Sequence, residues 1–190
     1  MDFDMHSRVL TSGGVVRLGR SETLSPLRLS TIRSLLDESF DGDFSNDDWE
    51  HAYGGMHVWL EEQGEIVSHG ALVPRRLFVG AIEMTVGYVE AVATKPARQG
   101  AGLGTAVLHV LGEAIRYEHV LGALSTDRAE FYERSGWQRW QGPTFVRLGN
   151  GDLERTRDDD GGIFVLRTPR TPSIDLTSSI ACDAREGDTW

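Results

Sequence analysis

The sequence predicts a mixed α/β fold of the α+β kind, in which helices flank a central mixed, mostly antiparallel sheet. Three observations point to this class: apolar residues at helical spacing near the N-terminus, a group of short strand-like runs in the centre, and a strand, helix, strand unit in the second half. No linker divides the 190 residues, so we expect one domain over residues 1–190.

The N-terminal part predicts one strand and two helices. Residues 15–18 form the expected strand. Ser25 and Pro26 predict the start of a helix over residues 26–40, because serine caps a helix and proline fits its first position. The polar segment 45–48 resembles a second capping sequence, so a short helix is expected after it.

Short strands dominate the centre of the chain. Few residues separate them, which favours hairpins and antiparallel pairing. Pro74 is expected to end one strand, with a new strand from Leu77, because proline cannot donate a ladder hydrogen bond. The expected strands are 56–61, 66–73, 77–82 and 85–94.

A helix with one apolar face opens the second half. Within residues 105–117, Val107, Leu111 and Ile115 recur every four residues. The tail, residues 168–190, shows little periodicity and predicts no strand. The other expected elements are a strand at 120–126, a short helix at 128–135 with Gly136 after its end, an extended segment at 137–148 and a strand at 163–166.

Charge and composition exclude several classes of partner. The formal net charge of −10 disfavours nucleic acids and anionic membranes and favours cationic ligands. No apolar run approaches the roughly 20 residues that span a bilayer, and the polar segment 1–11 does not resemble a signal peptide. The single cysteine, Cys182, cannot form an internal disulfide. We therefore expect a cytoplasmic protein.

Residues 99–104 predict a phosphate-binding loop. Gly100, Gly102 and Gly104 follow a predicted strand, and a helix opens at once. The first turn of a helix carries unpaired N–H donors and a partial positive charge, which suit a pyrophosphate. The glycine spacing fits neither the P-loop nor the dinucleotide fingerprint. A purely structural turn is the alternative interpretation.

Residues 98–104, Arg-Gln-Gly-Ala-Gly-Leu-Gly, resemble the Gln/Arg-x-x-Gly-x-Gly/Ala signature of GCN5-related N-acetyltransferases. Residues 89–94 are similar to the strand on which that family places the acetyl group. Residues 128–137 resemble its helix with a tyrosine followed by Gly-Phe or Gly-Trp. The resemblance implies this family's fold and an enzyme that uses acetyl-CoA and releases CoA.

A narrower resemblance, to aminoglycoside 2′-N-acetyltransferases, covers about residues 40–190. It implies acetyl transfer to the 2′-amino group of an aminoglycoside, and it suggests a homodimer. One departure is Ala91, where glycine is expected after the glutamate. The matching segments, in the family's order, are 42–44, 48–51, 54–57, 87–90, 121–125, 142–144, 158–161 and 187–190.

The resemblance also implies roles in the acetyl-CoA site. The backbone of residues 92–94 pairs with the pantetheine arm, and the N–H of Val92 stabilises the oxyanion. Tyr132 protonates the leaving thiolate, although a tyrosine packed on a helix would look the same in sequence. The cofactor-binding set is Val92, Ala93, Thr94, Gln99, Gly100, Ala101, Gly102, Leu103, Gly104 and Thr105.

Two carboxylates are candidates for the base that deprotonates the amine: the side chain of Glu90 and the terminal carboxylate of Trp190. The sequence does not rank them, and Glu90 is equally explained as a structural acid. The resemblance also implies that the C-terminal tail, with Trp190 as its anchor, folds into the active site. Carboxylates also recognise a polycationic antibiotic through charged hydrogen bonds. The resemblance places in the substrate site Asp43, Asp48, Glu90, Ala91, Ser125, Asp159, Asp188 and Trp190.

Two other functions remain compatible with the sequence. The acidic clusters equally fit an acetyltransferase for another cationic small-molecule amine, such as a polyamine or a peptidoglycan amine. The same fold also serves non-catalytic CoA-binding modules. His51 and His57 lack the spacing of metal ligands, so no metal is expected.

Overall fold

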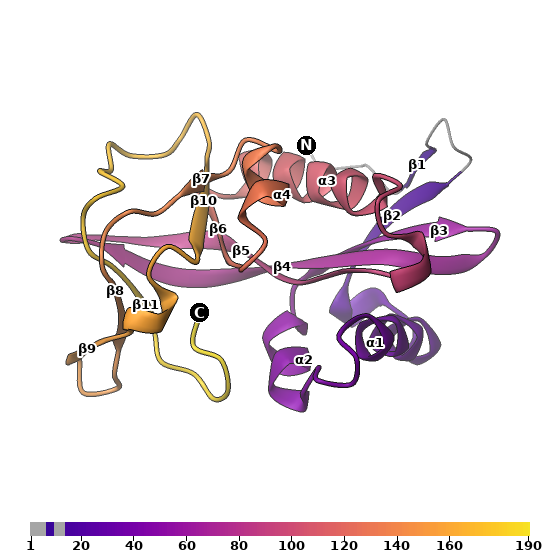
Figure 1. Cartoon of the computed structure of the whole chain (residues 1–190), viewed down its shortest axis with the longest axis horizontal. Helices are drawn as coiled ribbons and strands as arrows, with labels where there is room; N and C mark the ends of the chain where they lie inside the picture. The colour runs from indigo at the N-terminus through magenta and orange to yellow at the C-terminus, as the bar shows by residue number, and fades with distance from the viewer. Residues whose placement is uncertain (1–6, 10–13) are drawn as a thin grey trace. The chain divides into compact units, whose positions relative to one another are not determined.

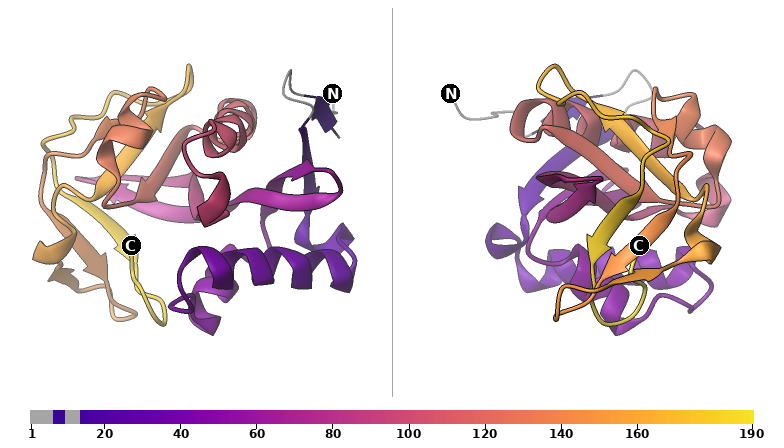
Figure 2. Two further views of the ribbon diagram at one scale, coloured as in Figure 1. Left: turned by 45° about the vertical axis from the view of Figure 1, so that its right-hand side comes forward. Right: turned by 90° about the vertical axis from the view of Figure 1, so that its left-hand side faces the viewer.

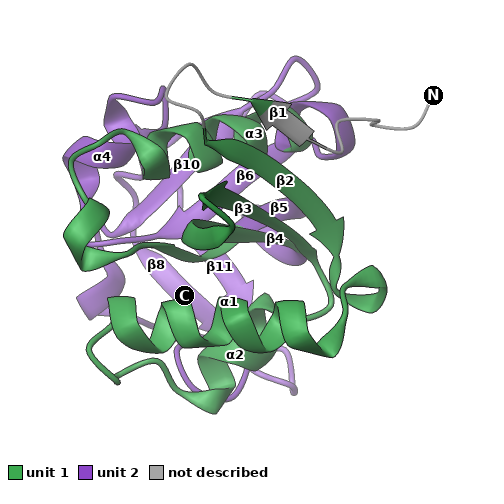
Figure 3. Ribbon diagram, turned by 90° about the vertical axis from the view of Figure 1, so that its right-hand side faces the viewer, with its two compact units in different colours: residues 1–73, 89–114 green, residues 74–88, 115–190 purple. Residues whose placement is uncertain are grey.

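The computed structural model describes residues 7–9 and 14–190 (Figure 1, Figure 2). These residues form two compact units whose sequences interleave (Figure 3). Unit 1 comprises the described residues up to Val73 together with 89–114, and unit 2 comprises 74–88 and 115–190. The N-terminal segment 1–11, whose polarity argues against a signal peptide, lies outside the described residues except for 7–9.

Unit 1 is a sheet with helices on both faces. Its first four strands are antiparallel neighbours, in the order β1, β2, β3, β4. Helices α1 and α2 cover one face and α3 covers the other (Figure 1, Figure 3). Its elements are β1 (Ser7–Val9), β2 (Val15–Arg20), η1 (Ser21–Thr23), α1 (Pro26–Ser39), α2 (Asn46–Ala52), β3 (Met56–Glu62), the first part of β4 (Glu65–Val79), the last part of β5 (Ile82–Thr94), η2 (Pro96–Arg98) and most of α3 (Leu103–Glu118).

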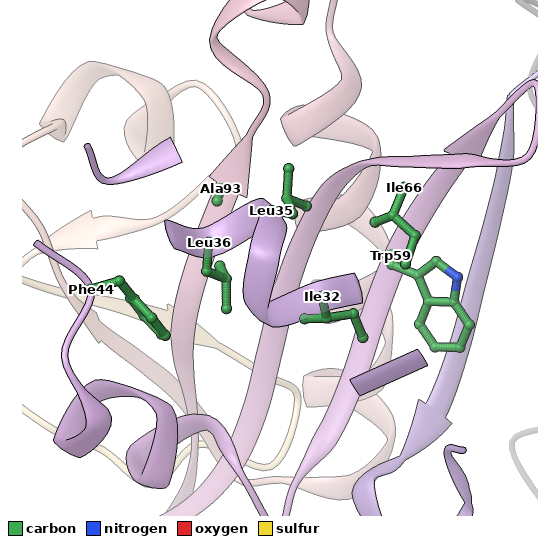
Figure 4. Close-up of a cluster of buried hydrophobic side chains, with 7 residues drawn as sticks. All are labelled: Ile32, Leu35, Leu36, Phe44, Trp59, Ile66 and Ala93. Carbon is green, nitrogen blue, oxygen red and sulfur yellow. The ribbon is translucent and has the colours of Figure 1, made fainter. Parts of the chain in front are cut away.

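Helix α1 begins as the sequence predicts. The Ser25 hydroxyl accepts a hydrogen bond from the Arg28 N–H at 3.2 Å, and Pro26 occupies the first helical position. The helix turns Ile32 and Leu36 onto the sheet, and both are fully buried. Each such side chain contributes about 1.5–3 kcal/mol on burial. The cluster they form is shown in Figure 4 and consists of Ile32, Leu35, Leu36, Phe44, Trp59, Ile66 and Ala93.

Helix α3 approaches the opposite face of the unit 1 sheet closely because β4 carries a glycine there. A Cβ built on Gly70 would lie 2.8 Å from the Leu111 side chain and 3.3 Å from that of Val107. Such distances are shorter than ordinary van der Waals contact. A larger residue at position 70 would therefore push the helix that carries the glycine loop away from the sheet.

A β-bulge interrupts the pairing of β3 with β4. Leu60 pairs with Ser68, but Glu61 pairs with Ile66, so Val67 is the extra residue. The Val67 carbonyl instead accepts a hydrogen bond from the N–H of Lys95 at 2.9 Å. The bulge thus ties the end of β5 to β4.

Unit 2 contains a second group of strands. β6 pairs in parallel with β5 at Gly87 and Tyr88, and antiparallel with β10, which also pairs with β7. β11, in yellow in Figure 2, pairs antiparallel with β4 and parallel with β8. The remaining elements are β6 (Leu121–Ser125), α4 (Ala129–Glu133), β7 (Gln138–Arg139), β8 (Thr144–Arg147), β9 (Leu153–Arg155), η3 (Arg157–Asp159), β10 (Ile163–Arg167) and β11 (Ile180–Asp183).

The structure confirms most predicted elements and the mostly antiparallel pairing. The pairs that β2, β3 and β10 form with their neighbours are antiparallel, as is β8–β9, whereas β5–β6 and β8–β11 are parallel. Gly136 follows α4 with φ of 85°, as expected for a residue that ends a helix. No helix in the described part of the chain has both the length and the apolar character needed to cross a membrane.

The prediction that Pro74 ends a strand is wrong. β4 runs without interruption from Glu65 to Val79. Its register with β3 ends at Leu72, and its register with β11 begins at Leu77. Pro74 lies between these two partners, where the missing N–H removes no ladder hydrogen bond from either register.

The C-terminal tail contains a strand that the sequence does not predict. Ile180 to Asp183 form β11, and Ile180, Ala181 and Cys182 are buried. Four residues are too few to show a period-2 pattern, and the partners of β11 lie far away in sequence. Only the three-dimensional pairing reveals this strand.

Candidate functional site

The glycine loop of unit 1 leads directly into α3. Gly100 and Gly102 both have φ of 78°, a conformation that residues with a Cβ rarely adopt. The N–H of Ala106 donates to the Gly102 carbonyl at 3.1 Å, so helical hydrogen bonding begins at Gly102. An added Cβ at either glycine would meet nothing within 4 Å. Backbone conformation, and not packing, therefore requires glycine at both positions.

The start of α3 offers backbone donors to an anion. The N–H groups of Leu103, Gly104 and Thr105 belong to the first helical turn, which has no intrahelical acceptors for them and carries a partial positive charge. Residues 99–102 are exposed, whereas the Leu103 side chain is buried and anchors the helix start. This arrangement suits a pyrophosphate.

Contacts within unit 1 hold the loop in place. The Gln99 side-chain amide donates to the carbonyl of Thr94 at 3.2 Å, and Arg98 forms an ion pair with Glu62. Both interactions fasten the loop to its own sheet. The donors of α3 are therefore positioned before any ligand arrives.

Strand β5 carries a left-handed residue at Ala91, whose φ is 50°. For a residue with a Cβ this conformation costs about 1–2 kcal/mol. Glu90, Ala91 and Val92 are half-buried, and Ala93 is buried. Alanine thus replaces the glycine expected here, but the backbone keeps a conformation typical of glycine.

Two side chains of β4 hold the backbone around Ala91. The Nδ1 atom of His69 lies 2.9 Å from the Ala91 carbonyl oxygen. The Ser68 hydroxyl donates to the Ala93 carbonyl at 2.9 Å and lies 2.8 Å from the hydroxyl of Thr94. The carbonyls on both sides of Val92 are therefore fixed by side chains.

A buried polar chain continues from His69. Its Nε2 atom lies 2.9 Å from Nδ1 of His57, and Nε2 of His57 lies 2.9 Å from the Ser21 hydroxyl. All three side chains are buried. Burial lowers the pKa of His57 to about 4 and that of His69 to about 3, so both imidazoles are neutral near pH 7.

The two aspartates predicted in unit 1 differ in their surroundings. Asp43 is exposed. Asp48 is partly buried, and its carboxylate accepts hydrogen bonds from the N–H and the hydroxyl of Ser45, both at 2.8 Å. These contacts form a capping box at the start of α2. Asp48 therefore has a structural task, whatever else it binds.

In unit 2, Tyr132 lies on the short helix α4. Its ring is buried, and it packs edge-on against Phe131 and Trp137, with ring centroids 4.9 and 6.0 Å away. Burial raises the pKa of the Tyr132 hydroxyl well above its ordinary value. The hydroxyl thus keeps its proton at neutral pH and can donate it. Ser125 ends β6 and is exposed.

The C-terminal residue is fixed within unit 2. Trp190 is 6% exposed, and its indole N–H donates to the Thr156 hydroxyl at 3.2 Å. The carbonyl of Thr189 accepts hydrogen bonds from Nη2 of Arg75 at 2.7 Å and from Sγ of Cys182 at 3.4 Å. Burial raises the pKa of the Cys182 thiol to about 11. The end of the chain is packed and hydrogen-bonded.

The acidic run 158–160 divides into two parts. Arg155 pairs with Asp160 and lowers the pKa of that carboxyl to about 2. Burial raises the pKa of Asp159, and the nearby negative charges of Asp158 and Asp188 raise it further. Asp159 and Asp188 are thus close enough to interact. The Asp160 charge is already compensated, whereas the Asp159 carboxylate would be stabilised by a cation.

Arg75, like His69, makes a contact that the sequence does not predict. It lies beside Pro74, where the sequence predicts a gap between strands, and no motif includes it. Its guanidinium holds the carbonyls of Thr189 and Asp183, the latter at 3.3 Å, and lies 4.6 Å from the centre of the Tyr88 ring. Among the described residues, no group of three metal-binding side chains exists.

Comparisons with known proteins agree with these features. An acetyltransferase (GNAT) domain model matches residues 24–140. A curated protein from Mycolicibacterium fortuitum, named aminoglycoside 2′-N-acetyltransferase, is 42% identical in an alignment 185 residues long. The match covers 94% of this chain and 94% of that protein.

Solved structures show the same fold. The GNAT family N-acetyltransferase YhbS from Escherichia coli, in complex with CoA, covers 96% of this chain and 92% of its own, with a TM-score of 0.60 and 14% identity. A GNAT acetyltransferase from Brucella melitensis, in complex with acetyl-CoA, covers 84% of this chain and 93% of its own, with a TM-score of 0.56 and 20% identity.

The predicted fold class and the predicted cofactor are therefore confirmed: the protein has the GNAT fold and is an acetyl-CoA-dependent N-acetyltransferase. The chain belongs to the GNAT acetyltransferases and, within them, to the family of the aminoglycoside 2′-N-acetyltransferases.

Proposed function

We propose that the protein transfers the acetyl group of acetyl-CoA to the 2′-amino group of an aminoglycoside. The observation that carries this proposal is the 42% identity to the Mycolicibacterium protein across 94% of both chains. Such a match extends far beyond the cofactor loop. We also infer a cytoplasmic location, because acetyl-CoA is supplied there.

The residues of unit 1 fit the cofactor side of this reaction. Acetyl-CoA supplies a thioester whose carbonyl carbon is open to attack. The loop from Gln99 to Thr105 offers its backbone to the pyrophosphate, and the backbone of residues 92–94 offers an edge to the pantetheine arm. The N–H of Val92 is the proposed oxyanion donor.

The transfer needs two proton movements. The neutral amine attacks the carbonyl carbon, the new C–N bond forms, and the C–S bond breaks. The amine proton passes to Glu90 or to the terminal carboxylate of Trp190, and the leaving thiolate takes a proton from Tyr132. The family segment 128–137 assigns Tyr132 as the donor. Burial raises its pKa, which keeps the hydroxyl protonated before the transfer but also makes it a weaker acid.

The acidic side chains of the family segments are proposed to bind the ammonium groups of the antibiotic. Asp159 and Asp188 are the best supported, because burial and then the nearby negative charges raise the pKa of Asp159, and a cation would stabilise its carboxylate. Asp43, Asp48 and Ser125 complete the proposed set. The capping contacts of Asp48 with Ser45 orient its carboxylate.

The decisive test compares two aminoglycosides that differ only in an amino or a hydroxyl group at the 2′ position. Thiol release should occur with the first and not with the second, and NMR of the product should show acetylation at the 2′ nitrogen. Acetylation at another nitrogen would contradict the proposal. Faster turnover of a polyamine or a peptidoglycan amine would favour a different cationic substrate.

Tight acetyl-CoA binding without thiol release from any amine would indicate a non-catalytic CoA-binding module. The proposed homodimer rests on the family resemblance. Light scattering of the purified protein tests it, since a dimer has about twice the mass of the 21.0 kDa chain.

A further inference from the structure

We propose that His69 is a positioning residue that aims the N–H of Val92 by holding the carbonyl of Ala91. The inference rests on the proposed role of Val92 as oxyanion donor. It assigns a task to a buried histidine that lies outside every motif of the sequence.

The covalent geometry of one peptide group links the two atoms. The Ala91 carbonyl and the Val92 N–H belong to the same planar trans peptide, so they point in opposite directions. Fixing the carbonyl oxygen therefore fixes the direction of the N–H. His69 Nδ1, 2.9 Å from that oxygen, is the side-chain contact that does so.

The carbonyl of Ala91 determines the donor and acceptor of every hydrogen bond in the buried chain of side chains from His69 to Ser21. A carbonyl oxygen only accepts, so Nδ1 of His69 donates to Ala91, and in the neutral ring its Nε2 must then accept. Nδ1 of His57 donates to that Nε2, and Nε2 of His57 accepts from the hydroxyl of Ser21. The Ser21 oxygen in turn accepts from the N–H of Gly54 at 2.9 Å. The Ser21 hydroxyl also lies 3.2 Å from the Gly55 carbonyl, but that carbonyl already accepts from the Ser21 N–H at 3.0 Å, so the hydroxyl proton is available to His57.

The hydrogen-bonded series of Ser21, His57 and His69 does not serve as a proton relay. It ends on the carbonyl of Ala91, which has no proton to pass on. The lowered pKa values of His57 and His69, caused by burial, keep both rings neutral at working pH. The chain therefore orients the peptide and does not exchange protons with a substrate.

The peptide needs this support because its backbone is strained. Ala91 has φ of 50°, which disfavours the conformation that presents the Val92 N–H. On the other side of Val92, Ser68 holds the carbonyl of Ala93 at 2.9 Å. A hydrogen bond to the Ala91 carbonyl also polarises the same peptide and strengthens its N–H as a donor.

Two substitutions at position 69 separate positioning from simple packing. His69→Leu keeps the volume but removes the donor, and it should lower kcat about 10- to 100-fold, since losing a whole oxyanion donor costs about 100- to 1,000-fold. KM for acetyl-CoA should stay within about threefold. His69→Asn puts an amide N–H near the position of Nδ1, so it should recover most of kcat although its link to His57 is lost.

Ser21→Ala is the matched control. It removes the buried hydrogen bonds of the Ser21 hydroxyl with His57, Gly54 and Gly55, but it leaves the contact of His69 with Ala91. It should lower the melting temperature, with kcat within about threefold of the unchanged protein. The proposal is overturned if His69→Leu keeps more than about a third of kcat, if His69→Asn is no better than His69→Leu, or if Ser21→Ala loses as much activity.

A spectroscopic measurement needs neither substrate nor a variant. Nitrogen-15 NMR of the histidine rings near pH 7 should show His69 protonated at Nδ1 and unprotonated at Nε2. The opposite tautomer would overturn the proposal even if His69→Leu failed to fold. A protein that acetylates no aminoglycoside would instead disprove the proposed function, and the NMR result would be unaffected.

Discussion

Hydrogen bonds of different range hold Gln99 and Asp48 in unit 1 and the C-terminal residues in unit 2. In unit 1, Gln99 binds Thr94 five residues away, and Asp48 binds Ser45 three residues away. In unit 2, Arg75 binds Thr189, which lies 114 residues further along the chain. Trp190 binds Thr156 across 34 residues. Short-range contacts leave a sequence pattern, whereas long-range contacts leave none.

The largest expected effect is a loss of folding stability in acid, caused by the two buried histidines of unit 1, His57 and His69. It tests whether unit 1 is more sensitive to acid than unit 2. The folded pKa values of these histidines, about 4 and about 3, lie below the unfolded value of about 6.5. Stability is therefore complete above pH 6.5 and is lost as pH falls toward the folded values. At pH 5 the loss is about 2 kcal/mol for each histidine.

Urea unfolding at pH 7.5 and pH 5 measures this loss. His69→Asn should show about half of the change that the unchanged chain shows, because one titrating group is removed. An equal change in both proteins would mean that carboxylates, and not the histidines, control acid sensitivity. That result would mean that the buried histidines do not make unit 1 the more acid-sensitive unit.

Tyr132→Phe probes unit 2 at its proposed acid and should lower kcat about 100-fold, because the leaving thiolate loses its proton donor. Since burial raises the pKa of Tyr132, kcat of the unchanged enzyme should not fall from tyrosine ionisation as pH rises through about 10. Tyr117→Phe, at an exposed tyrosine of α3, is the control and should leave kcat unaltered. Steady-state kinetics on both variants would reveal whether the hydroxyl or the ring matters.

Deletion of Trp190 tests whether the long-range contacts of the tail serve catalysis. We expect kcat/KM for the aminoglycoside to fall about 30-fold, equivalent to one charged hydrogen bond of about 2 kcal/mol. Calorimetric affinity for CoA should stay within about twofold, because the glycine loop lies in unit 1. Trp190→Phe retains the terminal carboxylate and should lose less. Unchanged turnover after the deletion would exclude the tail from the mechanism.

The smallest expected effect comes from Ala91→Gly. Glycine relieves about 1–2 kcal/mol of backbone strain in the folded state. Its greater conformational freedom in the unfolded chain offsets about 0.5–1 kcal/mol of this stabilisation. The variant should be slightly more stable in thermal melts. Ala93→Gly, at a buried position whose φ is not positive, should be less stable than the unchanged chain. Equal destabilisation of both would show that Ala91 is not strained.

Sequence reasoning succeeded where neighbours along the chain determine the structure. Ser25 and Pro26 predict the start of α1, and the glycines at 100 and 102 adopt the conformations for which glycine is needed. It failed where a distant partner decides. Pro74 continues a strand because β3 ends and β11 begins around it. The short β11 exists only because β4 and β8 pair with it.

The same division applies to the candidate site. The loop and the strand from Glu90 to Thr94 follow from local motifs, and the family resemblance supplied Tyr132 and Trp190. His69 could not be predicted, because its partner Ala91 is 22 residues away and is reached through a bulged strand. Arg75 could not be predicted either, because no motif near it in the sequence indicates a contact with Thr189 at the other end of the chain.

The buried Cys182 makes this protein convenient to label. It is the chain's single cysteine, it is fully buried, and burial raises the pKa of its thiol to about 11. A cysteine introduced on the surface would therefore be the first thiol to react with a maleimide dye. Cys182 also donates to the carbonyl of Thr189. The rate at which Cys182 itself is alkylated would therefore report how often the C-terminal residues detach from it.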